Sequence, residues 1–116
     1  MTVLIILNEP PYGNERSYNG LRLAGSLARQ NDTQVKVFLI GDAVGCAKAG
    51  QKVPQGFYNV QLMLTAVLHH AGMIGACGSC LDARGIQDQE LIEGIRRGSM
   101  EELTAWTLVG DKVISF

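Results

Sequence analysis

Residues 3–7 read VLIIL, a run of five apolar residues close to the start of the chain. The run has the length of a β-strand and shows no alternation between apolar and polar residues. Continuous apolar strands are typical of parallel sheets, in which helices cover both faces of each strand. The run therefore predicts a buried strand in a parallel sheet.

Patterns typical of helices and of strands alternate along the rest of the chain. Apolar spacing, an acidic first turn and a capping pattern of Ser99 with Glu102 predict helices over residues 15–30, 57–71, 87–92 and 99–108. Further apolar runs predict strands over residues 34–40, 73–77 and 111–116, with a brief strand or turn over 92–97. The alternation predicts an α/β domain with a mostly parallel sheet.

The long segment at residues 41–56 contains four glycines and one proline, and it predicts a loop with one helical turn around residues 44–49. Loops of this length in a compact domain are usually functional or mobile. Ligands of parallel α/β sheets bind beyond the carboxyl ends of the strands. We therefore expect residues 8–14, 41–56 and 77–82, which follow the first three strands, to meet at one edge of the sheet.

Length and charge narrow the class of protein. The chain has 116 residues, 47% of them hydrophobic and 18% charged, which is typical of one soluble globular domain. Ten basic and eleven acidic residues leave no excess of positive charge, so the composition argues against nucleic-acid binding. The apolar run at residues 3–7 is too short for a signal peptide or a membrane span. We expect a cytoplasmic protein, not bound to a membrane, whose thiols are kept reduced.

The segment at residues 75–85, GACGSCLDARG, places Cys77 at the end of the third predicted strand and Cys80 three residues later. A thiol reacts as its thiolate, and the start of a helix can lower the pKa of a cysteine there. If a helical turn begins after Cys77, then Cys80 lies one turn along and can resolve an oxidised or persulfidated Cys77. Arg84 can add positive charge, although the sequence does not give its direction.

Other interpretations of the two cysteines compete with a reactive pair. Cys77 and Cys80 can be buried simply as small hydrophobic residues. A structural zinc site needs four ligands, and Cys46, His69 and His70 stand at no recognised spacing for the remaining two. Thioredoxin-like domains need a proline after the motif, and this chain has none there. The glycines of residues 41–45 match no nucleotide-binding pattern, so the sequence predicts neither a metal nor a cofactor.

Three further side chains are secondary candidates. Cys46 lies in the loop at residues 41–56, where it can either assist Cys77 or pack in the core. His69 and His70 lie at the end of the second predicted helix, far along the chain from the expected edge. Because helix C-termini favour a positive imidazole, a surface or capping role is expected for both histidines.

Five segments, taken in order, resemble the DsrE/DsrF-like family, which includes the YchN-like proteins. They are PYG at 11–13, GDAV at 41–44, PQGFYN at 54–59, CGSCLDARG at 77–85 and DKVISF at 111–116. The resemblance spans nearly the whole chain. It implies a single DsrE-like domain over residues 1–116, with a three-layer α/β/α architecture and a mostly parallel five-stranded sheet. It also implies a small cytoplasmic protein that assembles as a homotrimer or homohexamer.

The resemblance further implies a function. In sulfur-relay members such as DsrE and TusD, a cysteine after the third strand accepts sulfur as a persulfide and passes it to a partner protein, and Cys77 matches that position. The predicted partners are therefore a sulfur donor protein and a sulfur acceptor protein. This chain also carries Cys80, so a dithiol cycle can replace or supplement simple carriage. Two alternatives stay open, a Cys77–Cys80 redox switch and a non-catalytic small-ligand or regulatory module built on the loop at 41–56.

Overall fold

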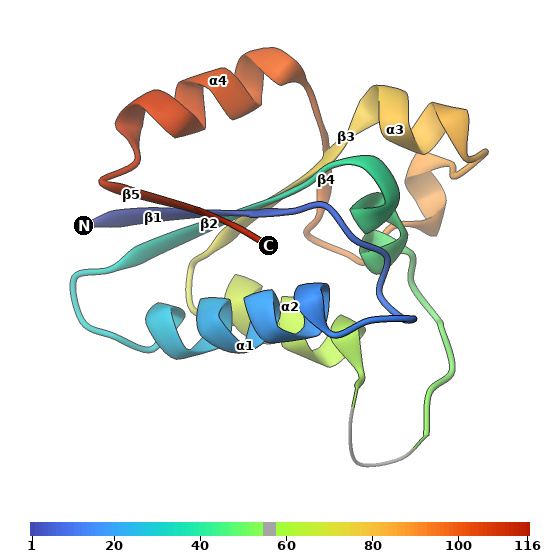
Figure 1. Cartoon of the computed structure of the whole chain (residues 1–116), viewed down its shortest axis with the longest axis horizontal. Helices are drawn as coiled ribbons and strands as arrows, with labels where there is room; N and C mark the ends of the chain where they lie inside the picture. The colour runs from blue at the N-terminus through green and yellow to red at the C-terminus, as the bar shows by residue number, and fades with distance from the viewer. Residues whose placement is uncertain (55–57) are drawn as a thin grey trace.

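The computed structural model of the chain describes residues 1–54 and 58–116, and these form an α/β fold in which helices flank a parallel sheet (Figure 1). The strands are β1 (Thr2–Leu7), β2 (Gln34–Leu39), β3 (Met73–Cys77), β4 (Arg96–Gly98) and β5 (Lys112–Ser115). The helices are α1 (Arg16–Ala28), α2 (Val60–His69), α3 (Gly78–Ala83) and α4 (Met100–Val109), with 3₁₀ helices η1 (Gly41–Ala47) and η2 (Asp88–Glu90).

The described strands form a five-stranded sheet in the order β4-β3-β2-β1-β5, and every neighbouring pair is parallel. The register of β1 against β2 runs from Thr2 opposite Gln34 to Leu7 opposite Leu39. Four of the five residues in the VLIIL run are almost completely buried, because β1 lies between β2 and β5 with helices over both faces. The prediction from that run is confirmed.

Helices α1 and α2 cover one face of the sheet and α4 covers the other, which gives three layers (Figure 1). On the first face, Gly20 of α1 lies so close to β1 that an added Cβ would stand 2.5 Å from a methyl of Leu7. On the second face, the ring of Trp106 in α4 meets Phe38 of β2 edge to face, with their centroids 6.0 Å apart. The expected α/β architecture with its five-stranded sheet is therefore present.

Some predicted elements differ from the structure in type or position. In place of the helix predicted at residues 87–92, the chain forms a single 3₁₀ turn, η2. The brief strand or turn predicted at residues 92–97 includes a strand only at its end, where β4 spans residues 96–98. The helical turn expected at residues 44–49 is η1, and it begins as early as Gly41, whose φ of +60° lets the chain turn directly after β2. In the part of the chain that the structure describes, no helix is long and apolar enough to cross a membrane.

Helix α2 begins and ends inside its predicted range. It starts at Val60, where the side chain of Asn59 accepts a hydrogen bond from the backbone N–H of Leu62 at 3.2 Å. Residue 57, the predicted start, lies outside the described residues. The helix ends at His69, and the left-handed residue after it is Ala71 rather than the predicted stop at Gly72.

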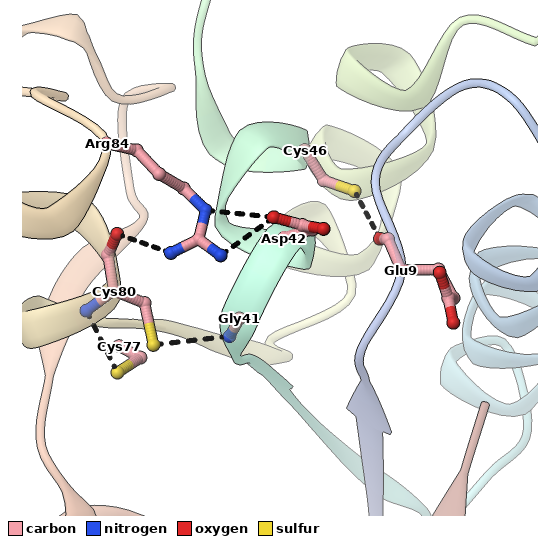
Figure 2. A network of polar contacts seen from close by, with 7 residues as sticks. All are labelled: Glu9, Gly41, Asp42, Cys46, Cys77, Cys80 and Arg84. Carbon is pink, nitrogen blue, oxygen red and sulfur yellow. Dashed lines mark hydrogen bonds and ion pairs between the residues drawn. The ribbon is translucent and has the colours of Figure 1, made fainter.

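The segments after β1, β2 and β3 meet at the carboxyl edge of the sheet, as expected from the strand pattern. The backbone N–H of Gly41 reaches the sulfur of Cys80 at 3.2 Å, which joins the segment after β2 to the segment after β3. The sulfur of Cys46 lies 4.0 Å from the backbone oxygen of Glu9, which joins the segment after β2 to the segment after β1. Figure 2 shows all three segments around these contacts.

Candidate functional site

Cys77 is the last residue of β3 and the N-cap of α3, so its thiol stands where the strand turns into the helix. Its sulfur accepts a hydrogen bond from the backbone N–H of Cys80 at 3.4 Å and lies 3.4 Å from the hydroxyl oxygen of Ser79. Gly78 lets the side chain of Arg97 pack against the start of α3, because a Cβ there would lie 2.8 Å from Nε of Arg97. The predicted helix start after Cys77 is therefore present, and it directs polar hydrogens at the sulfur.

The surroundings of Cys77 favour its thiolate. Burial by itself raises the pKa of the Cys77 thiol, but hydrogen bonds from the side chains and backbone N–H groups of Cys80 and Ser79 outweigh burial and leave the pKa below its ordinary value. The residue is only 8% exposed, so a thiolate formed there is largely shielded from water. The lowered pKa is typical of a nucleophilic cysteine, whereas the small exposed fraction means that a reagent must reach this sulfur through an opening in the surface.

Cys80 has a different environment on the first turn of α3. Its sulfur accepts a hydrogen bond from the backbone N–H of Gly41 at 3.2 Å (Figure 2). Burial and the hydrogen bond between the two thiols raise the pKa of Cys80, as does the charge on Cys77, whereas the Gly41 N–H and the charge of Arg84 lower it. The net direction is upward, so Cys80 is the protonated member of the pair when Cys77 is the thiolate.

Arg84 joins α3 to η1 across the edge of the sheet. Its Nε and one terminal nitrogen donate to the same carboxylate oxygen of Asp42, at 3.1 and 2.7 Å, and its other terminal nitrogen donates to the backbone oxygen of Cys80 at 3.0 Å. The sequence singled out Arg84 without giving its direction. Figure 2 shows its guanidinium lying between Asp42 and Cys80.

A cavity of about 320 Å³ lies beside Cys77, between the start of α3, the end of β4 and the start of α4. Phe38 and Met100 give it apolar walls, and Ser79 and Arg97 give it polar ones. Of the three cysteines, Cys77 is the one that lines this cavity. A small sulfur-bearing group can therefore approach the Cys77 sulfur from this side.

Arg97 is a site residue that sequence reasoning missed. Its guanidinium forms ion pairs with Asp82 at 2.6 Å and Asp88 at 3.0 Å and donates to the backbone oxygen of Gly78 at 3.1 Å. It therefore fixes the first residue of α3, directly after Cys77. In the sequence, Arg97 is simply a basic residue in the segment that follows the short helix. The pairing of β4 with β3 places Arg97 beside the end of β3, and local sequence patterns do not reveal this pairing.

The other candidate residues lie away from this cavity. Cys46 is fully buried in η1, and Figure 2 shows its thiol pointing to Glu9 and away from the Cys77–Cys80 pair. Burial raises the pKa of Cys46 to about 12, so this thiol is kept protonated in the core. His69 ends α2 and His70 caps it, and both are exposed. Over residues 1–54 and 58–116, no group of three or more Cys, His, Asp or Glu side chains is placed to hold a metal ion.

Comparison with known proteins gives one consistent family. The sequence profile described as the DsrE/DsrF-like family matches residues 1–116. Protein YchN of Escherichia coli (strain K12) is 40% identical over 115 residues, which cover 98% of this chain and 97% of that protein. An uncharacterized protein of Methanopyrus kandleri is 35% identical over 114 residues, which cover 98% of this chain and 93% of that protein.

Solved structures give the same result for the fold. The crystal structure of the ychN protein from E. coli matches with a TM-score of 0.93 and 39% identity, covering 99% of this chain and 98% of that one. A protein of unknown function from Methanobacterium thermoautotrophicum matches with a TM-score of 0.79 over 99% of this chain and 98% of that one. Its identity is 14%, so this second likeness concerns the fold alone.

Proposed function

The chain belongs to the DsrE/DsrF-like family, and on that premise we propose that it is a sulfur-relay protein. Cys77 receives sulfane sulfur, holds it as a persulfide and passes it to an acceptor protein. The observation that carries the proposal is that Cys77 combines a lowered pKa with a position on the wall of a cavity. Cys46 is buried in the core, and Cys80 is turned to the Gly41 N–H.

The proposed transfer is a thiolate exchange in two steps. The Cys77 thiolate attacks the outer sulfur of a donor persulfide, a new S–S bond forms on Cys77, and the donor leaves as its thiolate. An acceptor thiolate then attacks the outer sulfur on Cys77, and Cys77 leaves as a thiolate again. Neither step needs an external oxidant or reductant, because the sulfane sulfur keeps its oxidation state. Low thiol pKa favours both attack by Cys77 and its departure.

The neighbourhood of Cys77 supports both steps. The N–H of Cys80 and the hydroxyl of Ser79, each 3.4 Å from the sulfur, stabilise the thiolate that attacks first and leaves last. The cavity of about 320 Å³ exceeds the roughly 30 Å³ that one water-sized group occupies, so an added sulfur atom fits within it. The partners under this proposal are a donor protein and an acceptor protein, and the cytoplasmic homotrimer or homohexamer implied by the family resemblance stays a prediction.

The proposal is tested by loading the protein with a low-molecular-weight persulfide and measuring its intact mass. We expect the wild type to gain the mass of one sulfur atom, and we expect Cys77→Ala to lose at least about nine tenths of that gain, because the thiolate is the nucleophile. Cys46→Ala is the matched control and keeps the gain, since its thiol is buried and protonated. An undiminished adduct on Cys77→Ala would sink the proposal.

One observation favours a second candidate, a dithiol redox switch. The backbone N–H of Cys80 donates to the sulfur of Cys77 at 3.4 Å, and each thiol shifts the pKa of the other, so the two side chains are neighbours before any disulfide forms. A switch predicts a reversible disulfide between them across dithiol redox buffers, read by alkylation of the remaining thiols. If both thiols stay fully alkylated in the most oxidising buffer, the switch is excluded and simple carriage is left.

The small-ligand module also stays a candidate, on one observation. A hollow of about 490 Å³ lies beside the segments at residues 11–15 and 52–54, with Tyr12 and Lys52 on its walls, and none of the cysteines lines it. This alternative predicts that replacing Cys77 and Cys80 together leaves cellular sulfur transfer unchanged. A loss of transfer in that double variant would favour the relay.

A further inference from the structure

We propose that Arg84 is a positioning residue for Cys80, and that with Gly41 it holds Cys80 ready as the second nucleophile of the pair. This inference rests on the proposed function, because it starts from the Cys77 persulfide, and it adds a second route by which that sulfur leaves, as free hydrosulfide rather than on an acceptor protein. The contacts that carry it join three elements, η1, β3 and α3, at the edge where they meet (Figure 2).

Arg84 holds the backbone of Cys80 from one side. One terminal nitrogen of its guanidinium donates to the backbone oxygen of Cys80 at 3.0 Å, while Nε and the other terminal nitrogen hold Asp42. Asp42 directly follows Gly41, whose N–H donates to the sulfur of Cys80 at 3.2 Å. A single side chain therefore contacts the residue that carries the thiol and the residue next to the hydrogen-bond donor.

The end of β2 fixes the direction of that donor. The strand ends at Leu39, and Ile40 after it keeps an extended backbone, with φ of −129° and ψ of 152°. The N–H of Ile40 donates to the oxygen of Leu7 in β1, so the next N–H, that of Gly41, points to the other side of the strand, where α3 follows β3. Gly41 has a φ of +60°, which turns the chain after this N–H. The hydrogen bond to Cys80 is therefore set by the end of β2, and Arg84 ties α3 to the same segment through Asp42.

In the described part of the chain, Arg84 at the end of α3 and Cys77 at the end of β3 act electrostatically on Cys80, and Asp42 of η1 is paired with Arg84. Asp82, two residues further along α3, is paired with Arg97. The Gly41 N–H and the charge of Arg84 both favour a Cys80 thiolate, whereas the charge on Cys77 opposes it. Once the Cys77 sulfur is bonded to a second sulfur, any negative charge lies on that outer atom, one bond further along, so the opposition to a Cys80 thiolate weakens while the supporting groups remain.

The step that Cys80 would perform is a balanced displacement. Its thiolate attacks the inner sulfur of the Cys77 persulfide, the bond between the two persulfide sulfurs breaks, and the outer sulfur leaves as hydrosulfide. The two cysteines are oxidised to a disulfide and the sulfane sulfur is reduced to sulfide. An external dithiol reductant then returns the pair to its two thiols, at the cost of that dithiol being oxidised.

The test measures the pH dependence of Cys80 alkylation in a Cys77→Ser background, where no sulfur transfer takes place. Iodoacetamide is the probe, and peptide mass spectrometry separates Cys80 from Cys46. We expect Arg84→Met to raise the midpoint pH, at which the alkylation rate is half its maximum, by roughly 0.2 to 0.7 pH unit. This shift corresponds to the loss of an exposed charge interaction. Arg84→Lys keeps the positive charge but loses the planar guanidinium that contacts both Asp42 and Cys80. The midpoint pH of its alkylation rate should therefore lie between those of Arg84→Met and the parent.

The control is Lys48→Met, because Lys48 also forms an ion pair between η1 and the segment after α3, with Glu90 at 4.0 Å, but contacts neither thiol. Its midpoint should not move. Two outcomes would overturn the proposal. In the first, Arg84→Met alkylates faster at every pH but its midpoint pH does not move. In the second, Lys48→Met shows the same shift in midpoint pH as Arg84→Met. If Arg84→Met does not fold, Arg84→Gln takes its place, since it also removes the positive charge while keeping a polar side chain, and it should also raise the midpoint.

A second measurement tests the step itself. Persulfide-loaded protein should release sulfide several-fold more slowly as Arg84→Met than as the parent, and Cys80→Ser should release none by this route. If the protein takes up no sulfur at all, the proposed function fails. The alkylation experiment then still tests whether Arg84 positions Cys80, because it does not require sulfur loading. If it takes up sulfur and Arg84→Met releases sulfide at the parent rate, the inference fails and the proposed function does not.

Discussion

The three cysteines of this chain differ in what surrounds each sulfur. Cys77 stands on a cavity wall with hydrogen-bond donors around it, and Cys80 faces the backbone of Gly41. Cys46 is fully buried, and its thiol lies 4.0 Å from the backbone oxygen of Glu9. Because a thiolate needs donors or positive charge near it, the surroundings of Cys77 favour its thiolate and those of Cys46 oppose one.

The raised pKa of the buried Cys46 thiol predicts that the folded protein loses stability at high pH. Burial raises its pKa from an ordinary 9.0 to about 12, so above pH 9 the unfolded chain loses this proton while the folded chain keeps it. A raised folded pKa means that stability is intact below pH 9 and falls as pH rises toward 12. Between about pH 8 and about pH 10, the wild type should lose roughly 1.4 kcal/mol more free energy of unfolding than Cys46→Ala.

Urea unfolding at several pH values measures this difference. Cys46→Ala will be less stable than the wild type at neutral pH, since a buried side chain is shortened, so only the pH dependence is diagnostic. The two curves should converge as pH rises. Curves that stay parallel would show that Cys46 titrates alike in the folded and unfolded chain.

At the scale of elements, the end of α2 places an alanine in the left-handed backbone conformation that usually requires glycine. The N–H of Gly72 donates to the oxygen of Val67 at 3.0 Å, and the N–H of Ala71 donates to the oxygen of Leu68 at 3.1 Å. This is the Schellman pattern, in which the left-handed position is usually glycine. Here that position is Ala71, with φ of 62°, while Gly72 is needed because a Cβ would lie 2.5 Å from a methyl of Val67.

Ala71→Gly should therefore stabilise the protein by about 1 kcal/mol, because glycine adopts the left-handed conformation without the steric cost that alanine bears. Thermal or urea unfolding measures the change. The matched control is Ala105→Gly, the same substitution at an exposed position inside α4, which should destabilise by roughly 0.5 to 1 kcal/mol. The same sign for both variants would contradict this account of the helix end.

At the scale of the whole molecule, the strand order leaves an apolar surface at one edge. The edge strand β5 and the end of α4 carry Leu108, Val109 and Val113, which are 81%, 58% and 44% exposed. We call these three residues the α4–β5 patch. Exposed apolar side chains close together in the chain are typical of surfaces covered by another molecule. Because the family resemblance implies a homotrimer or homohexamer, the predicted occupant is a second copy of this chain.

Leu108→Glu should weaken that assembly by at least about ten-fold in its dissociation constant, because a charge would be buried in an apolar contact. Sedimentation velocity over a range of concentrations measures it. The control is Leu62→Glu, which places the same charge at a 66% exposed leucine on α2, over the opposite face of the sheet. The prediction fails if the wild type is a monomer throughout, or if both variants assemble like the wild type.

Much of the fold could be predicted because its signals are local. The VLIIL run, the helical spacing of apolar residues and the Ser99–Glu102 cap all act within a few positions of the chain, and each gave the right element. The short elements were harder to predict. η2 and β4 have three residues each, so neither contains enough residues to show a period, and packing of the neighbouring segments decides their type.

The sequence by itself determined the alternation of the longer helices and strands, and with it the meeting of the segments after β1, β2 and β3, because the carboxyl ends of parallel strands share one edge. It also placed Cys77 at a strand end. Only the tertiary structure decided which thiol faces the cavity, which faces Gly41, and where Arg84 and Arg97 point. Those contacts join residues 39 positions apart for Gly41 and Cys80, 42 for Asp42 and Arg84, and 19 for Gly78 and Arg97. They depend on the lateral order of the strands, which local apolar patterns do not specify.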